Sequence, residues 1–156
     1  MPAVFSIGYE RALIEDFLVT LQKAGSTYLV DVRDAPWSRR KEFVKGNLSE
    51  IMRAANIGYL HYKPLRNPPQ AREANKSGDT DTFRQLYHMQ LQSPMGKRAV
   101  TDLVGLASNE TPCLMCYERD PTMCHRLIIS GVLTRDHGIE VIHLYPPILN
   151  GQLSLF

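Results

Sequence analysis

The chain has 156 residues, a formal net charge of +2 and a hydrophobic fraction of 44%. This length suits one domain that buries its own core, and no apolar stretch is long enough to span a membrane. The first residues lack a signal-peptide pattern, and an odd number of cysteines, three, argues against a disulfide framework. We therefore expect a cytoplasmic protein in a reducing compartment, with no membrane partner.

Short apolar runs alternate with helical patterns along the chain. Mostly uninterrupted runs of β-branched and aromatic residues are typical of strands that are buried on both faces. The expected strands are Ala3–Ile7, Thr27–Val32, Tyr59–Tyr62, Pro112–Tyr117 and Glu140–Leu144. Apolar residues recur at helical spacing between them, and the last such stretch runs from Pro121 to His137. The alternation predicts an α/β fold, a three-layer sandwich with a mostly parallel five-stranded sheet flanked by helices.

Two segments interrupt this pattern. Residues 63–79 are polar and rich in proline, asparagine and arginine, which predicts a long loop. A Pro-Pro pair follows the last expected strand and acts as a stiff stop, because proline cannot continue a central strand. We expect a single α/β domain over residues 1–146 and a flexible tail over residues 147–156.

Charge is distributed unevenly. Between Arg33 and Lys76, ten lysines and arginines stand against four acidic residues, a net charge of +6, whereas each flanking segment sums to −2. A local basic surface on a near-neutral protein suits a polyanion such as DNA, and an ordinary solvated face is the alternative. Aromatic side chains among these cations suit the binding of single strands and extruded bases, unless they only pack the loop onto the sheet. The residues expected to bind nucleic acid or phosphate are Arg33, Trp37, Ser38, Arg39, Arg40, Lys41, Tyr62, His125 and Arg126.

Titratable side chains stand at the ends of the expected strands, where open parallel sheets gather their sites. Asp31, His61 and Glu118 hold such positions. Two carboxylates near one another suit general acid–base work or the stabilisation of a cationic transition state. The alternatives are a structural ion pair between Asp31 and Arg33 and a structural role for His61.

The stretch from Cys116 to Arg126 is the densest in such groups. An Asp-Pro pair predicts a helix start here, which would place Cys124 near the helix N-terminus. A helix N-terminus attracts anions and lowers the pKa of a thiol, so Cys124 is a candidate nucleophile. A plain turn with buried cysteines is the alternative. We expect neither a metal nor a cofactor, because Cys113 and Cys116 point to opposite faces of one strand.

Three motifs resemble the domain of unknown function 488 family. They are Ser6-Ile7-Gly8-Tyr9, Asp31-Val32-Arg33-x-x-Pro36-x-Ser38-Arg39 and Cys116-x-Glu118-x5-Cys124-His125-Arg126. With the strand at Val141–His143, the resemblance covers nearly the whole chain. It implies an α/β domain with a shared site and does not imply an established reaction.

The last five residues resemble the pentapeptide by which bacterial polymerases and repair proteins bind the β sliding clamp. They are Gln152, Leu153, Ser154, Leu155 and Phe156. In that use, the leucines and the phenylalanine enter or flank an apolar pocket, and the glutamine fixes the register by hydrogen bonds. A tail that folds back over an apolar patch is the alternative. The resemblance implies the clamp as a partner.

Together these features predict a clamp-recruited DNA repair or DNA-processing enzyme. The leading reaction is metal-independent cleavage of the N-glycosidic bond of a damaged or modified base. Asp31 or Glu118 would activate water or stabilise an oxocarbenium-like state, and Trp37 or Tyr62 would stack on the extruded base. The alternatives are a non-catalytic adaptor for DNA and the clamp, and a cysteine-dependent enzyme that acts on a phosphorylated substrate.

Overall fold

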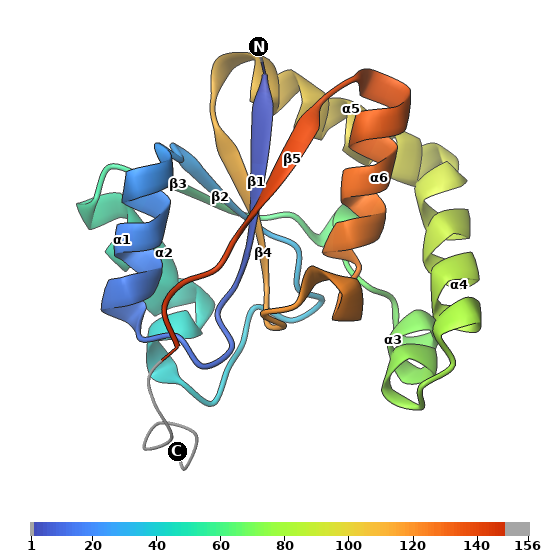
Figure 1. The fold of residues 1–156 in the computed structure, drawn as a ribbon, viewed down its shortest axis with the longest axis horizontal. Helices are drawn as coiled ribbons and strands as arrows, with labels where there is room; N and C mark the ends of the chain where they lie inside the picture. The colour runs from blue at the N-terminus through green and yellow to red at the C-terminus, as the bar shows by residue number, and fades with distance from the viewer. Residues whose placement is uncertain (1, 149–156) are drawn as a thin grey trace.

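The computed structural model describes residues 2–148, which form an α/β three-layer sandwich (Figure 1). The central strands are β1 (Ala3–Gly8), β2 (Tyr28–Asp31), β3 (Gly58–His61), β4 (Pro112–Cys116) and β5 (Glu140–Leu144). They lie in the order β3-β2-β4-β1-β5, and every neighbouring pair is parallel. The expected fold class is confirmed, and the sheet is wholly parallel.

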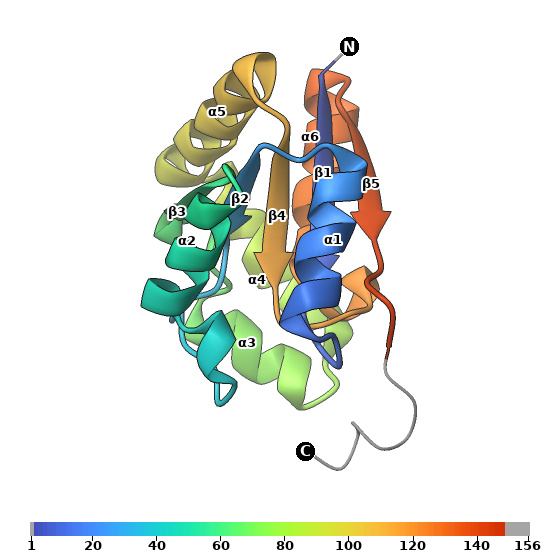
Figure 2. The same ribbon diagram turned by 90° about the vertical axis from the view of Figure 1, so that its left-hand side faces the viewer.

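Helices cover both faces of this sheet (Figure 2). The α-helices are α1 (Ile14–Ala24), α2 (Lys45–Ala54), α3 (Pro69–Lys76), α4 (Thr80–Gln92), α5 (Pro94–Asn109) and α6 (Arg126–His137). Short 3-10 helices are η1 (Lys41–Phe43), η2 (Lys63–Leu65) and η3 (Pro121–Met123). α1 and α2 pack on one face, and α3 to α6 pack on the other.

Each face of the sheet has its own apolar core. Leu29 of β2 packs with the side chains of α1 and α2, and its neighbour Val30 packs with those of α3 to α6. The same alternation along β4 places Cys113 in the first core and Cys116 in the second. The expectation that these two cysteines point to opposite faces is confirmed.

The expected long loop over residues 63–79 is wrong, because most of it is helical. η2 and α3 occupy this segment, and Pro69 stands at the start of α3, where its missing N–H costs nothing. Ala71 and Ala74, three residues apart, are the buried residues of α3. Alanines give a weak apolar signal in a sequence, so the polar residues around them concealed the helix.

The expected helix from Pro121 to His137 is also corrected, since it is two helices. Asp120 Oδ1 accepts a hydrogen bond from the Thr122 N–H at 2.9 Å and caps η3, which ends after Met123. Cys124 then adopts an extended conformation, and α6 begins at Arg126. Cys124 therefore does not lie in the first turn of a helix.

The tail prediction lies almost wholly outside the described residues. Pro147 and Ile148 are the last that the structure describes, so the clamp-binding prediction for Gln152–Phe156 stays a prediction. Among residues 2–148, no helix combines the length and the apolar character that crossing a membrane requires.

The topology places a crevice at the carboxyl edge of the sheet. β1 and β2 lead into α1 and α2 on one face, whereas β4, which lies between them, leads toward α6 on the other face. The loops that follow these strands therefore diverge. In open α/β sheets, ligands bind at such switch points.

Candidate functional site

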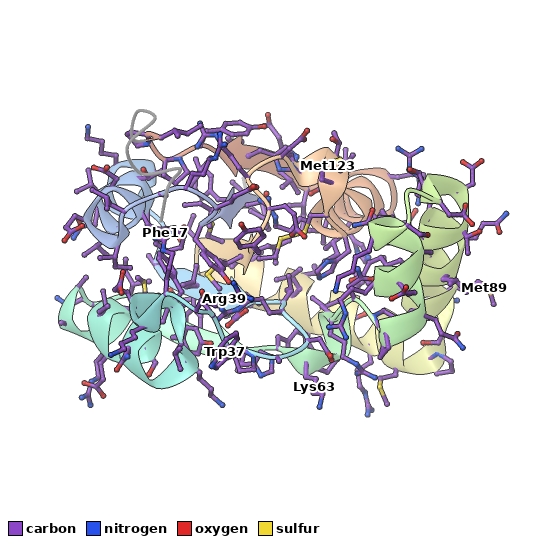
Figure 3. All side chains as sticks on the ribbon, turned by 90° about the horizontal axis from the view of Figure 1, so that it is seen from below. Phe17, Trp37, Arg39, Lys63, Met89 and Met123 are labelled. Carbon is purple, nitrogen blue, oxygen red and sulfur yellow. A yellow bond between two sulfur atoms is a disulfide. The ribbon has the colours of Figure 1, made fainter. Side chains whose placement is uncertain are left out.

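A pocket of about 240 Å³ opens at this switch point. The loops after β1, β2 and β4 form its wall together with α3 and the segment before α6. Figure 3 views this edge of the molecule, with Trp37 and Arg39 on the loop after β2. Because five separate parts of the chain converge here, the pocket gathers side chains that are distant in the sequence.

Glu118 places a carboxylate in the pocket wall. It lies half-buried in the loop after β4, and this burial raises the pKa of its side chain above the ordinary value. The loop approaches the end of β1 so closely that a Cβ on Gly8 would lie 1.9 Å from the Glu118 carbonyl oxygen. Glycine at position 8 is therefore required for this placement of Glu118.

Asp31 is fully buried at the end of β2 and does not line the pocket. Its Oδ1 accepts hydrogen bonds from the Arg33 backbone N–H at 3.1 Å and from Arg33 Nε at 2.9 Å. Its Oδ2 accepts from Arg33 Nη2 at 2.7 Å and from the Tyr59 hydroxyl at 2.5 Å. The carboxylate thus positions Arg33, whereas Glu118 lines the pocket itself.

Arg33 connects the buried Asp31 carboxylate to the pocket wall. Its Nη1 donates to the Tyr9 hydroxyl and to the Trp37 carbonyl, both at 3.3 Å. Burial alone would lower the pKa of Arg33, but the hydrogen bonds and the negative charge of Asp31 outweigh it and raise that pKa, so the guanidinium stays charged. It is only 7% exposed, and one Nη2 N–H is without a partner among the described residues. That N–H is available to an anionic or carbonyl group of a ligand.

Two histidines hold the start of the loop after β2 in place through hydrogen bonds to its backbone. His125 is buried, and its Nε2 donates to the Val32 carbonyl at 3.0 Å, which leaves Nδ1 as an acceptor 3.5 Å from Cys124 Sγ. Burial lowers the pKa of His125 to about 4, so the ring is neutral near pH 7. His61 Nε2 donates to the Arg33 carbonyl at 2.7 Å. Both rings hold backbone carbonyls of the Val32–Arg33 turn.

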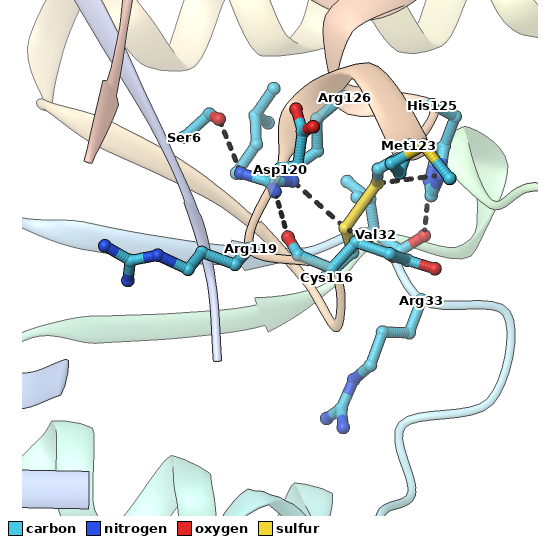
Figure 4. The surroundings of a disulfide bond; sticks show 12 residues. Ser6, Val32, Arg33, Cys116, Arg119, Asp120, Met123, His125 and Arg126 are labelled. Carbon is cyan, nitrogen blue, oxygen red and sulfur yellow. Dashed lines mark hydrogen bonds between the residues drawn. A yellow bond between two sulfur atoms is a disulfide. The ribbon is translucent and has the colours of Figure 1, made fainter. Parts of the chain in front are cut away.

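Arg126 is fully buried, and Figure 4 shows its hydrogen bonds to the residues around the disulfide. Its Nε donates to Cys116 Sγ at 3.0 Å, its Nη1 to Ser6 Oγ at 2.7 Å and its Nη2 to the Glu118 carbonyl. Burial lowers the pKa of this guanidinium. Arg126 therefore joins α6 to β1 and to the loop that carries Glu118, and it lies beneath the pocket surface.

Cys116 and Cys124 form a disulfide, whereas Cys113 is a buried free thiol. The odd number of cysteines argued against a disulfide framework, and this pair departs from that expectation: Cys124 adopts an extended conformation after η3 and pairs with Cys116 at the end of β4. Cys116, Cys124 and Glu118 have ligand atoms within 4.8 Å of one another. A metal would require the reduced pair, and the Arg126 guanidinium against Cys116 opposes a second cation there.

Residues 13–133 match the profile of a family described as a domain of unknown function, DUF488. This match covers well over half of the chain. The chain belongs to the DUF488 family. No curated protein and no solved structure matches it. The resemblance drawn from the sequence motifs is thereby confirmed at the level of the family, which carries no assigned reaction.

The predicted binding residues on the loop after β2 divide into two groups. Arg40 donates to the carbonyls of Tyr9 and Ala12 and lies against the Phe43 ring, and Ser38 Oγ accepts from the Arg40 N–H at 3.1 Å. These two residues hold the loop in place. The exposed members of the predicted binding set are Trp37, Arg39 and Lys41, and Trp37 lines the pocket.

Tyr62, which was predicted to stack on a base, is engaged elsewhere in the fold. Its hydroxyl donates to Asp102 Oδ2 of α5 at 2.9 Å, and its side chain packs on the core beneath α3 to α6. It does not line the pocket. Trp37 is therefore the better placed of the two aromatic residues for stacking on a base.

Sequence reasoning missed the part of the pocket wall that α3 supplies. Arg72 pairs with Asp34 at 3.3 Å, and Lys76 lies exposed at the rim. Asn67 also lines the pocket, and its buried Oδ1 has no hydrogen-bond partner among the described residues. The net charge of +6 over residues 33–76 was the available signal, but the loop interpretation did not place these side chains.

Proposed function

We propose that this DUF488 protein is a DNA-processing enzyme that hydrolyses the N-glycosidic bond of a damaged or modified base. The residues after Ile148 would recruit it to the β sliding clamp. One observation carries the proposal. The half-buried carboxylate of Glu118, with its raised pKa, shares a pocket with the exposed aromatic ring of Trp37 and a cationic rim.

The pocket wall supports the binding of an extruded nucleotide. Trp37 is 63% exposed and offers an aromatic face for a base. Lys76 and Arg72 of α3 lie on the wall and suit phosphate contacts, and Arg39 extends the positive surface along the loop. A buried acceptor at Asn67 would pair with an amino group of the base.

The reaction adds one water molecule across the bond between C1′ of the sugar and the base nitrogen. Glu118 would accept a proton from the attacking water as the base leaves, and it would face the positive charge that develops on the sugar. A raised pKa makes a carboxylate a stronger base. Asp31 would act as a positioning residue, because both its oxygens hold Arg33 and Tyr59.

The test measures base release from oligonucleotides that each carry one deaminated, alkylated or oxidised base. Single-stranded and duplex forms are incubated with the full chain in EDTA, and abasic sites are detected by alkaline cleavage. We expect release from at least one substrate, and Glu118→Gln should slow it by at least about 100-fold. Glu140→Gln is the matched control. Glu140 is an exposed acid at the start of β5, on the edge of the sheet opposite the pocket.

The test distinguishes a wrong role for Glu118 from the absence of catalysis. Base release that Glu118→Gln leaves at the wild-type rate would exclude the assigned role of Glu118. Tight binding of DNA with no release from any substrate would instead identify a non-catalytic DNA-binding protein.

A further inference from the structure

The Arg126 guanidinium is a buried charge, and none of the carboxylates in residues 2–148 is in contact with it. It is fully buried, and its described hydrogen-bond acceptors are the Cys116 sulfur, the Ser6 hydroxyl and the Glu118 carbonyl. No carboxylate of the described residues lies within salt-bridge distance of it, whereas buried Arg33 has Asp31. Burying a cation without a counter-charge is costly, so a site of this kind favours an anion among its neighbours.

Cys116 is the neighbour that can supply this anion. Arg126 Nε points at its sulfur from 3.0 Å, and Cys116 lines the pocket. A cation in contact with a thiol favours the thiolate. When the bond to Cys124 is open, a Cys116 thiolate would neutralise Arg126.

Cys124 has a different partner. Its sulfur lies 3.5 Å from Nδ1 of His125, and the hydrogen bond from Nε2 to Val32 leaves Nδ1 as an acceptor. A neutral acceptor suits the protonated thiol. The two sulfurs of one pair thus have environments that favour opposite protonation states.

We propose that Cys116 and Cys124 form a reversible dithiol–disulfide pair, in which Cys116 is the nucleophilic thiolate held by Arg126 and low-molecular-weight disulfides are the oxidant. This inference does not depend on the proposed glycosidic reaction. It also reassigns the reactive thiol, because the sequence pointed to Cys124 and the buried cation points to Cys116.

The exchange proceeds in two displacements. The Cys116 thiolate attacks one sulfur of a small disulfide RSSR, forms a mixed disulfide and releases RS⁻. Cys124 then loses its proton, by way of His125 Nδ1, and its sulfur attacks the Cys116 sulfur and displaces the second RS⁻. The protein pair loses two electrons, RSSR gains them, and the Cys124 proton passes to one departing thiolate. Two RSH molecules reverse the reaction.

Glu118 opposes the thiolate, because its Oε2 lies 3.4 Å from Cys116 Sγ. Two anions would then share one guanidinium, and burial already makes this carboxyl group easier to protonate. The other titratable groups that line the pocket with Cys116 are Tyr9, Arg33, Asp34, Arg72, Lys76 and His125. Because cationic side chains outnumber acidic ones around the pocket, the electrostatic potential of the pocket also favours the thiolate.

The test titrates single thiols in the reduced full chain, under nitrogen and in EDTA. Ultraviolet absorbance of the thiolate reports ionisation without requiring access to the buried sulfur. Cys124→Ser leaves Cys116, and Cys116→Ser leaves Cys124. Cys113 is common to both variants, and burial raises its pKa well above the usual range, so it does not contribute near neutral pH.

We expect Cys116 to ionise about two pH units below Cys124, which gives about 100-fold more thiolate in mildly acidic solution. Glu118→Gln, added to Cys124→Ser, should lower the Cys116 midpoint further. Arg126→Met, if it folds, should raise that midpoint. In wild-type protein, glutathione disulfide should close the pair, with release of two glutathione thiols per chain.

Two results would overturn the proposal. One is a Cys116 midpoint equal to or above that of Cys124. The other is wild-type protein in which glutathione disulfide stops at a stable mixed disulfide. Both measurements leave Arg126 in place, so neither depends on whether its substitution is tolerated.

Discussion

His125 is held neutral by its surroundings. The ring is buried, Nε2 donates to Val32, and Arg126 follows it directly in the chain. Burial and the nearby guanidinium both disfavour an imidazolium, which lowers the pKa of His125 to about 4. An unfolded chain would protonate the same ring near pH 6.5. Acid therefore favours the unfolded state through this residue.

This difference predicts acid sensitivity between about pH 6.5 and pH 4. In this window the unfolded chain binds a proton that the folded protein does not, so the free energy of unfolding falls as the pH falls. The loss amounts to about 3 kcal/mol over the window. Urea unfolding at several pH values measures it.

His125→Gln is the informative variant, because an amide nitrogen retains a donor for Val32 and does not titrate. Its free energy of unfolding should depend less on pH in the same window. His88→Gln, which changes an exposed histidine of α4, is the matched control. A pH dependence in His125→Gln as steep as in wild-type protein would contradict the assignment.

At the scale of elements, the end of β1 and the loop after β4 are joined by close backbone packing. The N–H groups of Tyr9 and Glu10 donate to the carbonyls of Cys116 and Tyr117 at 3.3 and 2.9 Å. These bonds continue the β1–β4 pairing beyond the strands. Gly8 lies at the centre of the contact and sets the distance between β1 and Glu118.

Gly8→Ala should therefore destabilise the fold by about 2 kcal/mol or more and displace Glu118, because the new Cβ would overlap its carbonyl. Gly105→Ala is the matched control, since Gly105 lies exposed within α5 and a Cβ there meets nothing within 4 Å. That change should stabilise the protein by about 0.5–1 kcal/mol. Thermal unfolding measures both, and equal effects would refute the argument.

The strands were predictable because their signals are strong and local. β5 has the expected bounds, and β4 ends one residue before the expected end. α3 was not predictable, because its buried residues are alanines among polar neighbours. The sequence placed Glu118 correctly in the site. It did not show that Asp31 is buried away from the pocket, because one of the groups that hold it, the Tyr59 hydroxyl, comes from β3. Contacts between distant strands leave little trace in a single sequence.

At the scale of the whole molecule, the apolar cores and the proposed clamp contact belong to different parts of the chain. The described residues 2–148 supply an apolar core on each face of the sheet. Because the proposed role of the last five residues is to bind the clamp, we expect removal of Gln152–Phe156 to leave the Tm unchanged. It should abolish binding to purified β sliding clamp, which we expect at an affinity on the order of micromolar.

Surface plasmon resonance with immobilised clamp measures this prediction. Leu155→Ala with Phe156→Ala should match the truncation, and Leu13→Ala, which changes a residue at the start of α1, is the control. Clamp binding that survives the truncation would remove the tail from the proposal. It would leave the base-release test of Glu118 unaffected.

β5 is parallel to β1, so the chain leaves the sheet at the edge where the pocket opens. The last described residues continue this course, and Tyr145 and Ile148 lie beside Glu10 and Arg119 of the neighbouring loops. A partner captured by the residues that follow Ile148 is thus tethered on the pocket's side of the molecule. An antiparallel last strand would have delivered the same partner to the opposite edge, where its effective concentration at the pocket would be low.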